Sequence, residues 1–401
     1  MLDKILTIAN LEAAYLEIVD RFLADCKNLT YHGLDDFFLR DYDLDSRQLI
    51  LTCQQELLAG KVIEPALSIK IPKKNKPGSF REIFIYNIKE RVKAQAIYRV
   101  VLPVLESHFS DRLFSYRPGR PPHLAARQFC RHYRRVFPNN QALILDLKNY
   151  SEQIDQQILI GQLNRIFDDP KIIDLLQLFI GNQVYRGGVI EKLDRGLVQG
   201  VPLVALFANL YLSDLDFKYQ RLVNFYVRVG DDIALLDSRQ EHLDDVGGRF
   251  LNDLSKLGLL LNDHKIYCGP ASGIYSFLGY QFNNGQISLE KGFVNKIIAG
   301  WQQILAQQHL SQRQKVSLLE KKMKQFTTNY NYQFSQLLAS KPQINNYQQI
   351  RWLADKFFAV MTKFLCTSYS PRQRRMISGQ LKRLGIKSPY QIYWQFHHGK
   401  S

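Results

Sequence analysis

The chain of 401 residues has few cysteines, no apolar run of membrane-spanning length and fewer acidic than basic residues. Its five cysteines are an odd number, widely spaced, with no Cys-x-x-Cys pair and no nearby histidine cluster. Neither a disulfide framework nor a zinc site is therefore expected. No stretch reaches the roughly 20 apolar residues that cross a bilayer, and the N-terminus carries scattered acids, unlike a signal peptide. We expect free, buried thiols and a cytoplasmic protein with no membrane partner.

Charge is abundant but unevenly distributed. The chain has 53 Lys and Arg against 37 Asp and Glu, a net charge of +16, which favours a polyanionic partner, nucleic acid before an acidic membrane surface. Residues 1–60 hold 5 basic and 11 acidic residues, whereas residues 286–401 hold 18 basic and 3 acidic residues. The C-terminal part is expected to supply much of the electrostatic attraction to nucleic acid, although a solvated basic helical face would have the same composition.

Hydrophobic periodicity predicts an α+β fold in four parts. Residues 1–60 have helical spacing, and "ALSIKIPKKNKPGSFREIFIYN" within residues 61–140 reads as two strands around a turn. Residues 141–285 begin with the strand "QALILDL" and contain an apolar helix, a hairpin and a further helix. Residues 286–401 are almost entirely helical in pattern. Strands are thus expected in the middle of the chain and helices at both ends.

Three carboxylates stand at the ends of expected strands. Asp231 and Asp232 interrupt the apolar, β-branched stretch "FYVRVGDDIALLD", and Asp146 closes the strand "QALILD". Each motif alone is equally explained by an ordinary hairpin turn or strand cap. On one antiparallel sheet, however, three acids without cations would repel strongly, and divalent metal is the natural remedy. Oxygen ligands with no His or Cys nearby favour two Mg²⁺ ions, which phosphoryl and nucleotidyl transfer require.

The order of the motifs resembles the reverse transcriptases of the bacterial group II intron lineage, including relatives of unknown group that are linked to phage defence. The matching blocks run from about residue 67 to 282. They include "FSYRPGRPPHLAA" (114–126), "LDLKNYSEQID" (145–155), "RGLVQGVPLVALFANLYLSDLD" (195–216), "VGDD" (229–232), "LGLLLNDHK" (257–265) and "FLGYQF" (277–282). The resemblance implies a right-hand polymerase with fingers (61–140), a palm that carries the carboxylates (141–285) and a basic helical thumb (286–401). In the first block, Arg117 and Gly119 would organise either the template strand or the palm.

The resemblance also assigns roles to single residues. Asp146 and Asp231 would bind both catalytic metals, Asp232 would support the site, and Leu147 is included in the metal set, with two Mg²⁺ ions that Mn²⁺ can replace. The nucleotide-binding set is Lys73, Arg81, Tyr150, Ser151, Gln199, Gly200 and Lys265. Two of these match family cations on the triphosphate, Lys73 and Arg81, and Lys265 matches a lysine near it. The Gln-Gly pair would lie against the nascent base pair, where missing side-chain bulk lets the backbone approach.

Three departures from the family pattern affect these expectations. Val229 replaces the hairpin tyrosine, and Val204-Ala205 replaces a Ser-Pro pair. Ser151 stands where relatives carry an aromatic ring that blocks a ribose 2′-hydroxyl, and Tyr150 precedes it. We expect Tyr150 to take over this sugar gate; relaxed sugar selection is the alternative. Since every metal-binding carboxylate is retained, the departures do not indicate loss of catalysis.

The leading functional hypothesis is an RNA-directed DNA polymerase that joins dNTPs to a primer 3′-hydroxyl on an RNA template, in an antiphage defence system. One alternative is template-independent or protein-primed DNA synthesis from the same site. Another is a non-catalytic RNA-binding splicing helper, which the basic C-terminal part permits and the complete carboxylate set disfavours. An associated non-coding RNA or a partner protein for the acidic N-terminal residues 1–60 are further candidate partners.

Overall fold

The structure is a computed structural model that describes residues 1–24, 33–35, 46–72, 78, 80–295, 298–299, 344–365, 391 and 394. The chain forms two compact units, each built from two separate segments. Unit 1 consists of Met1–Ala125 and Gln141–Gly269, and unit 2 consists of Ala126–Asn140 and Pro270–Ser401. The division into four parts at residues 60, 140 and 285 stays a prediction.

A four-stranded sheet in unit 1 contains the predicted strand pair around the Lys- and Pro-rich turn. Its strands, in the order β2-β1-β4-β5, are β2 (Phe80–Ile85), β1 (Ala66–Pro72), β4 (Gln183–Arg186) and β5 (Val189–Lys192). The first two are antiparallel, from Leu67 opposite Ile85 to Pro72 opposite Phe80, as the sequence predicts. The hairpin of β4 and β5, distant in sequence, extends this sheet because β4 pairs in parallel with β1.

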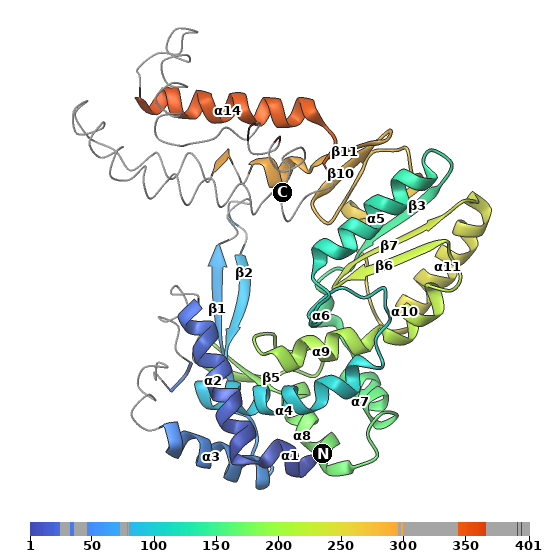
Figure 1. The fold of residues 1–401 in the computed structure, drawn as a ribbon. Helices are drawn as coiled ribbons and strands as arrows, with labels where there is room; N and C mark the ends of the chain where they lie inside the picture. Colours follow the sequence, from blue (N-terminus) through green and yellow to red (C-terminus); the bar gives the residue numbers. More distant parts are fainter. Residues whose placement is uncertain are drawn as a thin grey trace. The chain divides into compact units, whose positions relative to one another are not determined.

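The N-terminal helices of unit 1 pack on one long helix. They are α1 (Leu2–Leu6), α2 (Ile8–Ala24) and α3 (Ser46–Leu58), and all three contact α4 (Ile88–Glu106) (Figure 1). Apolar residues from these helices are buried at the contacts: Leu11, Cys53 and Val92 have no exposed surface. The predicted N-terminal helices are therefore confirmed, and they form part of the main hydrophobic core of unit 1.

A buried charge network joins α3 to α4. The ammonium of Lys93, with no exposed surface, lies 2.9 Å from Glu56 and 2.6 Å from Glu90. Lys89 and Lys61 also contact Glu56, at 2.9 and 2.7 Å. Burial alone would raise the pKa of Glu56, but hydrogen bonds from these three lysines lower it to about 2. Glu56 therefore stays ionised between the two helices.

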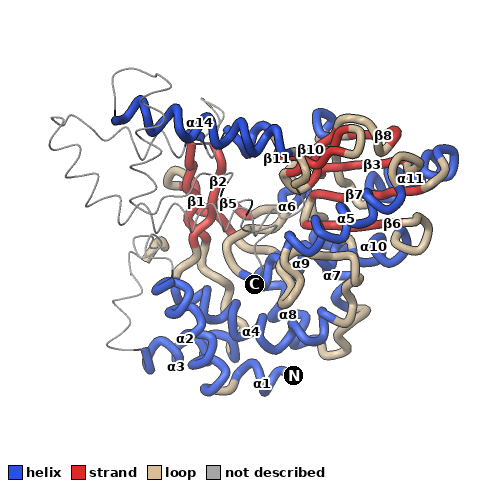
Figure 2. The backbone as a smooth tube through the Cα atoms, turned by 45° about the horizontal axis from the view of Figure 1, so that its top comes forward, coloured by secondary structure: helices blue, strands red, loops and turns tan. Residues whose placement is uncertain are grey.

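The second sheet of unit 1 has the strand order β6-β7-β3-β8. Its strands are β6 (Phe225–Val229), β7 (Asp232–Asp237), β3 (Gln141–Asp146) and β8 (Tyr267–Pro270), which lie side by side in Figure 2. The centre of the sheet is apolar, since Ile233, Ala234 and Leu235 of β7 have no exposed surface. The predicted helix after the Asp-Asp hairpin is confirmed as α11 (Gln240–Lys256), which contacts β7 and β3.

Short helices connect the two sheets of unit 1. They are α6 (Tyr150–Gln153), α7 (Gln156–Asn164), α8 (Pro170–Ile180), α9 (Pro202–Tyr211), α10 (Ser213–Tyr219) and the 3-10 helix η3 (Asp263–Lys265). The predicted apolar helix is α9, and its contacts with α4, α7, α8 and α10 explain why its sequence is apolar on nearly all sides. Asp155 caps α7 by accepting hydrogen bonds from the backbone amides of Gln157 and Ile158.

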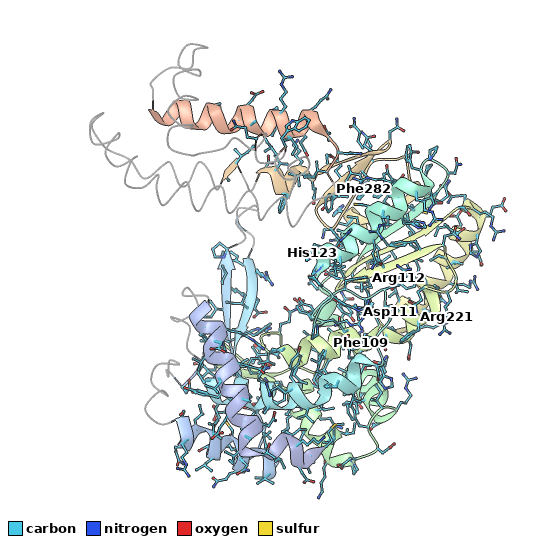
Figure 3. The ribbon with its side chains drawn as sticks, in the orientation of Figure 1. Phe109, Asp111, Arg112, His123, Arg221 and Phe282 are labelled. Atoms are coloured by element: carbon cyan, nitrogen blue, oxygen red, sulfur yellow. The ribbon has the colours of Figure 1, made fainter. Side chains whose placement is uncertain are left out.

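Unit 2 contains a small sheet with an aromatic core. The sheet order is β11-β10-β9, formed by β11 (Gln286–Leu289), β10 (Tyr280–Asn283) and β9 (Tyr275–Phe277). Phe282 is labelled in Figure 3. Phe129 and Tyr133, from helix α5 (Pro122–Val136), pack against its ring, each with its ring centroid 5.0 Å away. Gln349, from helix α14 (Tyr347–Leu365), exchanges two hydrogen bonds with the backbone of Leu289.

The exposure of the cysteines differs in part from the prediction. The described cysteines form no disulfide; Cys53 and Cys130 are buried, whereas Cys268 is exposed, so the expectation of buried thiols is wrong at that position. Cys268 lies on the edge strand β8, where alternate side chains face outward. No helix within the described part of the chain has the length and apolarity needed to cross a membrane.

Candidate active site

The sheet of unit 1 brings the predicted carboxylates together. Strands β3 and β7 are antiparallel, and their register places Asp146 opposite Asp232. Asp231 lies in the turn before β7, and its carbonyl accepts a hydrogen bond of 3.1 Å from the backbone N–H of Leu147. The prediction that one antiparallel sheet joins these distant acids is confirmed. The roles assigned to them stay predictions.

Asp146 is held by residues from the loop that follows α11. Its Oδ1 accepts a hydrogen bond of 2.9 Å from the side-chain amide of Asn262, and its Oδ2 one of 2.5 Å from the ammonium of Lys265. The backbone N–H of Asn262 also donates to the Asp146 carbonyl. Burial would lower the pKa of Lys265, but the ion pair with Asp146 raises it. The predicted Lys265 thus reaches the first carboxylate, beside Asn262, which the sequence reasoning did not select.

Asp231 is an exposed residue, yet the pKa of its carboxyl group is affected by the surrounding protein and by a neighbouring charge. Desolvation by the surrounding chain raises the pKa of Asp231, and the negative charge of Asp146 raises it further. Lys265 acts in the opposite direction. The negative charges of Asp146 and Asp231 lie close together at the strand ends, where a cation would be favoured.

The donor set fits a hard divalent cation held by few protein ligands. In the described part of the chain, no three or more His, Cys, Asp or Glu side chains are grouped as a metal cage. Mg²⁺, however, is typically bound by one or two carboxylates together with water and substrate phosphates. The side chains of Asp146 and Asp231 supply oxygen of this kind, whereas Leu147 could contribute only its backbone carbonyl. The ammonium of Lys265 already provides one positive charge beside Asp146.

A buried ion pair between Arg228 and Asp216 stabilises the hairpin that carries Asp231. Arg228, in β6, has no exposed surface and donates from Nε and Nη2 to the two carboxylate oxygens of Asp216, at 2.8 and 2.6 Å. Its Nη2 and Nη1 also donate to the carbonyls of Asn209 and Gly230, at 2.9 and 3.3 Å. The hydroxyl of Tyr226 completes the partners of Asp216 at 2.7 Å. The pair therefore ties the turn that carries Asp231 to α9 and α10.

The block "FSYRPG" docks beside the same hairpin. Leu113 forms a parallel bridge with Arg228, and the hydroxyl of Ser115 accepts a hydrogen bond of 3.0 Å from the backbone N–H of Gly230. Arg117 turns back onto its own segment, where it donates to Glu106 at 2.9 Å and to the carbonyl of Leu113 at 3.0 Å. Of the two predicted alternatives for Arg117, these contacts favour organisation of the palm.

A cavity of about 1490 Å³ opens in unit 1 beside the hairpin. Ligand pockets for small molecules have volumes of about 300–1,000 Å³, so this one is large enough for a nucleotide together with part of a polymer. Arg117 lines it, and so do six residues of the predicted metal- and nucleotide-binding sets: Arg81, Tyr150, Ser151, Gln199, Gly200 and Asp231. The other predicted residues, Asp146, Leu147, Asp232 and Lys265, lie outside its lining. Lys73 lies outside the described residues.

The Gln-Gly loop lies close to the end of β2. Gly200 has φ +133°, and a Cβ added there would lie 2.7 Å from the carbonyl oxygen of Phe84. Tyr86 fixes the same loop by donating a hydrogen bond of 2.9 Å to the carbonyl of Val198. The fold itself therefore requires a glycine at this position, and the approach to a nascent base pair stays a prediction.

Ser151 and Tyr150 both line the cavity. The amide of Gln199 donates a hydrogen bond to the hydroxyl of Ser151, which links the Gln-Gly loop to α6. Tyr150 is 7% exposed, and its hydroxyl donates to the carbonyl of Ala208 at 2.5 Å. Its ring is thus fixed beside the cavity, one position before the site where the family has its aromatic residue.

The cavity also contains cations that the sequence reasoning missed. Arg21, Arg91 and Arg120 contribute to its lining. Arg91 donates to the carbonyl of Tyr86 at 2.9 Å, and burial lowers its pKa. Arg120 lies in "FSYRPGRP" and Arg91 in "KERVK", but the sequence around a single arginine on a helix or loop does not reveal which cavity the side chain faces.

The chain belongs to the reverse transcriptase (RNA-dependent DNA polymerase) family, which it matches over residues 71–282. The match covers the whole sheet that carries the acids, with the Asp231 hairpin, and the other sheet of unit 1 except most of β1. Together with the mixed helices and antiparallel strands, it confirms the predicted α+β fold of a right-hand polymerase.

Two similar proteins of known sequence support the predicted lineage. Protein YkfC of Escherichia coli (strain K12) is 25% identical over 166 residues, which are 41% of this chain and 43% of that protein. The group II intron-encoded protein LtrA of Lactococcus lactis subsp. cremoris is 28% identical over 155 residues, 38% of this chain and 25% of that protein. The predicted resemblance to group II intron reverse transcriptases is confirmed. The chain spans less than half the length of these relatives.

Solved structures with a similar fold include two yeast telomerases. Apo telomerase from Candida tropicalis has a TM-score of 0.47 at 13% identity and covers 84% of this chain and 72% of that one. Telomerase from Candida albicans, in complex with the TWJ fragment of telomeric RNA, has a TM-score of 0.46 at 14% identity and covers 85% and 67%. Both scores are below 0.5, and the family assignment does not depend on them.

Proposed function

We propose that this protein is an RNA-directed DNA polymerase that joins dNTPs to the 3′-hydroxyl of a primer. The observation that carries the proposal is the register that sets Asp146 opposite Asp232, with Asp231 in the adjoining turn and on the wall of the large cavity. A binding protein for a polyanion has no use for acids grouped in this way, because they repel phosphates. A nucleotidyltransferase needs them to hold cations.

In the proposed reaction the 3′-hydroxyl oxygen of the primer forms a bond with the α-phosphorus of a dNTP, the hydroxyl proton is lost, and pyrophosphate leaves. Asp146 and Asp231 would hold two Mg²⁺ ions, for which Mn²⁺ could substitute, and Asp232 would support them. Divalent cations of this kind supply positive charge beside the attacking hydroxyl and the leaving pyrophosphate. Lys265, paired with Asp146 at 2.5 Å, adds a fixed cation to the same place.

Arginines of the cavity are proposed to bind the phosphates of the substrates. Arg81 is exposed on β2 and lines the cavity, as do Arg91 and Arg120. Guanidinium groups bind phosphate with two parallel hydrogen bonds, and their charge persists at all accessible pH values. The template and primer would then be recognised mainly through their backbones, which is appropriate for a polymerase that copies any sequence.

Primer extension tests the proposal. The wild-type chain, incubated with Mg²⁺ or Mn²⁺, dNTPs and a homopolymer RNA template with a DNA primer, should lengthen the primer, and Asp231→Ala should abolish this activity while leaving RNA binding intact. Asp245→Asn is the matched control, because Asp245 is an exposed acid on α11 that pairs with Arg249 at 2.6 Å. An inactive wild-type chain that still binds RNA on every template tried would refute the proposal and favour the splicing-helper alternative.

The same assay separates template-directed synthesis from the protein-primed alternative, which the replacements at Val229 and Val204-Ala205 motivate. Covalent priming would attach labelled nucleotide to the protein itself, and denaturing gel electrophoresis would show it. We propose that label appears only in the oligonucleotide. The role in antiphage defence and the cytoplasmic location remain proposals from the sequence.

A further inference from the structure

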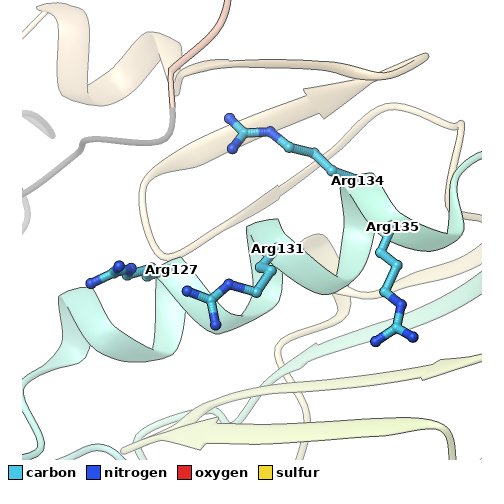
Figure 4. A pocket seen from close by; sticks show the side chains of 4 residues that line it. All are labelled: Arg127, Arg131, Arg134 and Arg135. Carbon is cyan, nitrogen blue, oxygen red and sulfur yellow. The ribbon is translucent and has the colours of Figure 1, made fainter. Parts of the chain in front are cut away.

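Four arginines form a stripe along helix α5, in unit 2. Arg127, Arg131, Arg134 and Arg135 are exposed and line a shallow cavity of about 440 Å³ (Figure 4). None of them lines the large cavity beside the carboxylates. The stripe is defined by these four residues and is therefore a feature separate from the proposed polymerase site.

The stripe follows from the spacing of the arginines. At about 100° per residue, these four positions fall within an arc of about 100° on the helix surface. The residues that α5 buries, including Phe129, Cys130 and Tyr133, lie on the other side of the helix. The aromatic core of unit 2 thus fixes which face of α5 is presented to solvent, and it presents the arginines.

The charge of this face is not balanced by its own helix. No acidic residue occurs in residues 122–136, and within the described residues Arg127, Arg131 and Arg135 form no ion pair. Like charges four residues apart on one face disfavour a helix. A surface of this kind is expected where a polyanion supplies the missing counter-charge.

We propose that the arginine stripe binds the phosphate backbone of double-stranded nucleic acid at a second site, outside the polymerase cavity. The nine residues from Arg127 to Arg135 extend about 12 Å along the helix axis, at about 1.5 Å for each of eight steps. One strand of a duplex has a phosphate every 3.4 Å or so along its axis, so this length carries about three to four phosphates. The number of guanidinium groups matches the number of phosphates that one strand presents over the same distance.

A single phosphorylated metabolite would be a poor match for this surface. A small anion engages two or three donors that converge on one point, whereas these side chains start from positions spread over more than two helical turns. Arginine forks also suit phosphodiester oxygens along a backbone, without any need to read the bases. The stripe should therefore bind duplexes without sequence preference and with strong dependence on salt.

The test measures the salt dependence of binding to a fluorescein-labelled RNA–DNA duplex of 30 base pairs by anisotropy. In the variant R127Q/R131Q/R134Q/R135Q, the slope of log K against log salt should become shallower by about 3 to 4, at roughly 0.9 for each phosphate that the protein no longer neutralises. Between 50 and 200 mM salt, wild-type affinity should fall roughly 150-fold more than that of the variant. The double variant R127Q/R131Q should lose about half as much slope, which guards against misfolding of the quadruple variant.

Two control variants distinguish an effect of the arginine stripe from an effect of the net charge of the protein. Replacing all four arginines with lysine retains the charges and should retain the slope. A second quadruple variant removes the same net charge from exposed arginines of unit 1 and should leave the slope unchanged: R165Q, R221Q, R239Q and R249Q. Extension of a short primer on a short template should be equal in the wild type and the stripe variant, because that reaction uses the polymerase cavity.

An unchanged slope in the two glutamine variants of α5 would overturn the proposal. An equal loss of slope in the unit 1 control would also overturn it, because that result would show an effect of net charge. A loss of slope seen only with single-stranded RNA would overturn it as well. Failure of this inference leaves the polymerase proposal intact, because binding and extension are read separately.

Discussion

The buried pair of Arg228 and Asp216 allows a quantitative prediction. Neither side chain has exposed surface, and two charge-assisted hydrogen bonds of 2.8 and 2.6 Å join them. Removing one member of such a pair leaves an uncompensated buried charge, which costs about 3–5 kcal/mol. We expect Asp216→Ala to destabilise the fold by this amount, a factor of roughly 10² to 10⁴ in the unfolding equilibrium.

Arg228→Met should cost less, near the lower end of the same range. It leaves Asp216 buried, but the hydroxyl of Tyr226 still donates to that carboxylate at 2.7 Å. The double variant R228M/D216A, which removes both charges, should be more stable than either single variant, because no unpaired charge remains. Urea unfolding of the three variants and the wild type measures all of these differences in one thermodynamic cycle.

The pair should also affect catalysis, because Arg228 holds the carbonyl of Gly230 in the turn that carries Asp231. The double variant should regain stability without regaining full primer extension, since methionine cannot donate to that carbonyl. Two results would refute the reasoning: single variants that cost less than about 1 kcal/mol, or a double variant whose cost equals the sum of the two single costs.

Three further predictions concern other parts of unit 1. Gly200→Ala should cost about 1–3 kcal/mol in urea unfolding and weaken extension, because its Cβ would lie 2.7 Å from the Phe84 carbonyl and its φ of +133° is unfavourable for alanine; a stable, active variant would contradict this. Glu56, whose folded pKa of about 2 is below its ordinary value of 4.5, stabilises the fold fully above pH 4.5 and loses this contribution as the pH falls through 2. Glu56→Gln should therefore remove up to about 3 kcal/mol of the pH dependence of stability between those values, and parallel curves for variant and wild type would argue against it. Tyr150→Val should increase incorporation of ATP relative to dATP, whereas Tyr150→Phe, which keeps the ring, should not; equal use of both nucleotides by the wild type would exclude Tyr150 as the sugar gate.

Much of the fold could be predicted from local patterns. The strands that end at Asp146 and begin at Asp232 follow from apolar runs closed by acids, and their antiparallel pairing follows from the need to gather the acids. The N-terminal helices and the helix after the hairpin follow from periodicity. The addition of β4 to the first sheet did not, because a parallel pairing over more than 100 residues leaves no local signal.

The sequence predicted the acidic residues of the candidate site better than the residues that hold those acids in place. Lys265 was selected by resemblance, and the structure places it on Asp146. Asn262, Ser115 and Arg228 were missed because their roles depend on contacts across separate segments of the chain. An arginine inside the apolar strand "FYVRV" could have served as a signal, since buried arginine requires a partner, but the sequence does not say which acid provides it.

The discontinuous make-up of unit 2 has a consequence during synthesis of the chain. The hydroxyl of Tyr133 on α5 accepts a hydrogen bond from the backbone of Gly285, 152 residues further along the chain. At about 5–20 residues per second, a ribosome needs about 8 to 30 s to deliver that partner after α5 has been made. Phe129 and Tyr133 must remain without Phe277 and Phe282 for this time, so nascent chains halted between residues 140 and 270 should be the ones that chaperones bind most strongly.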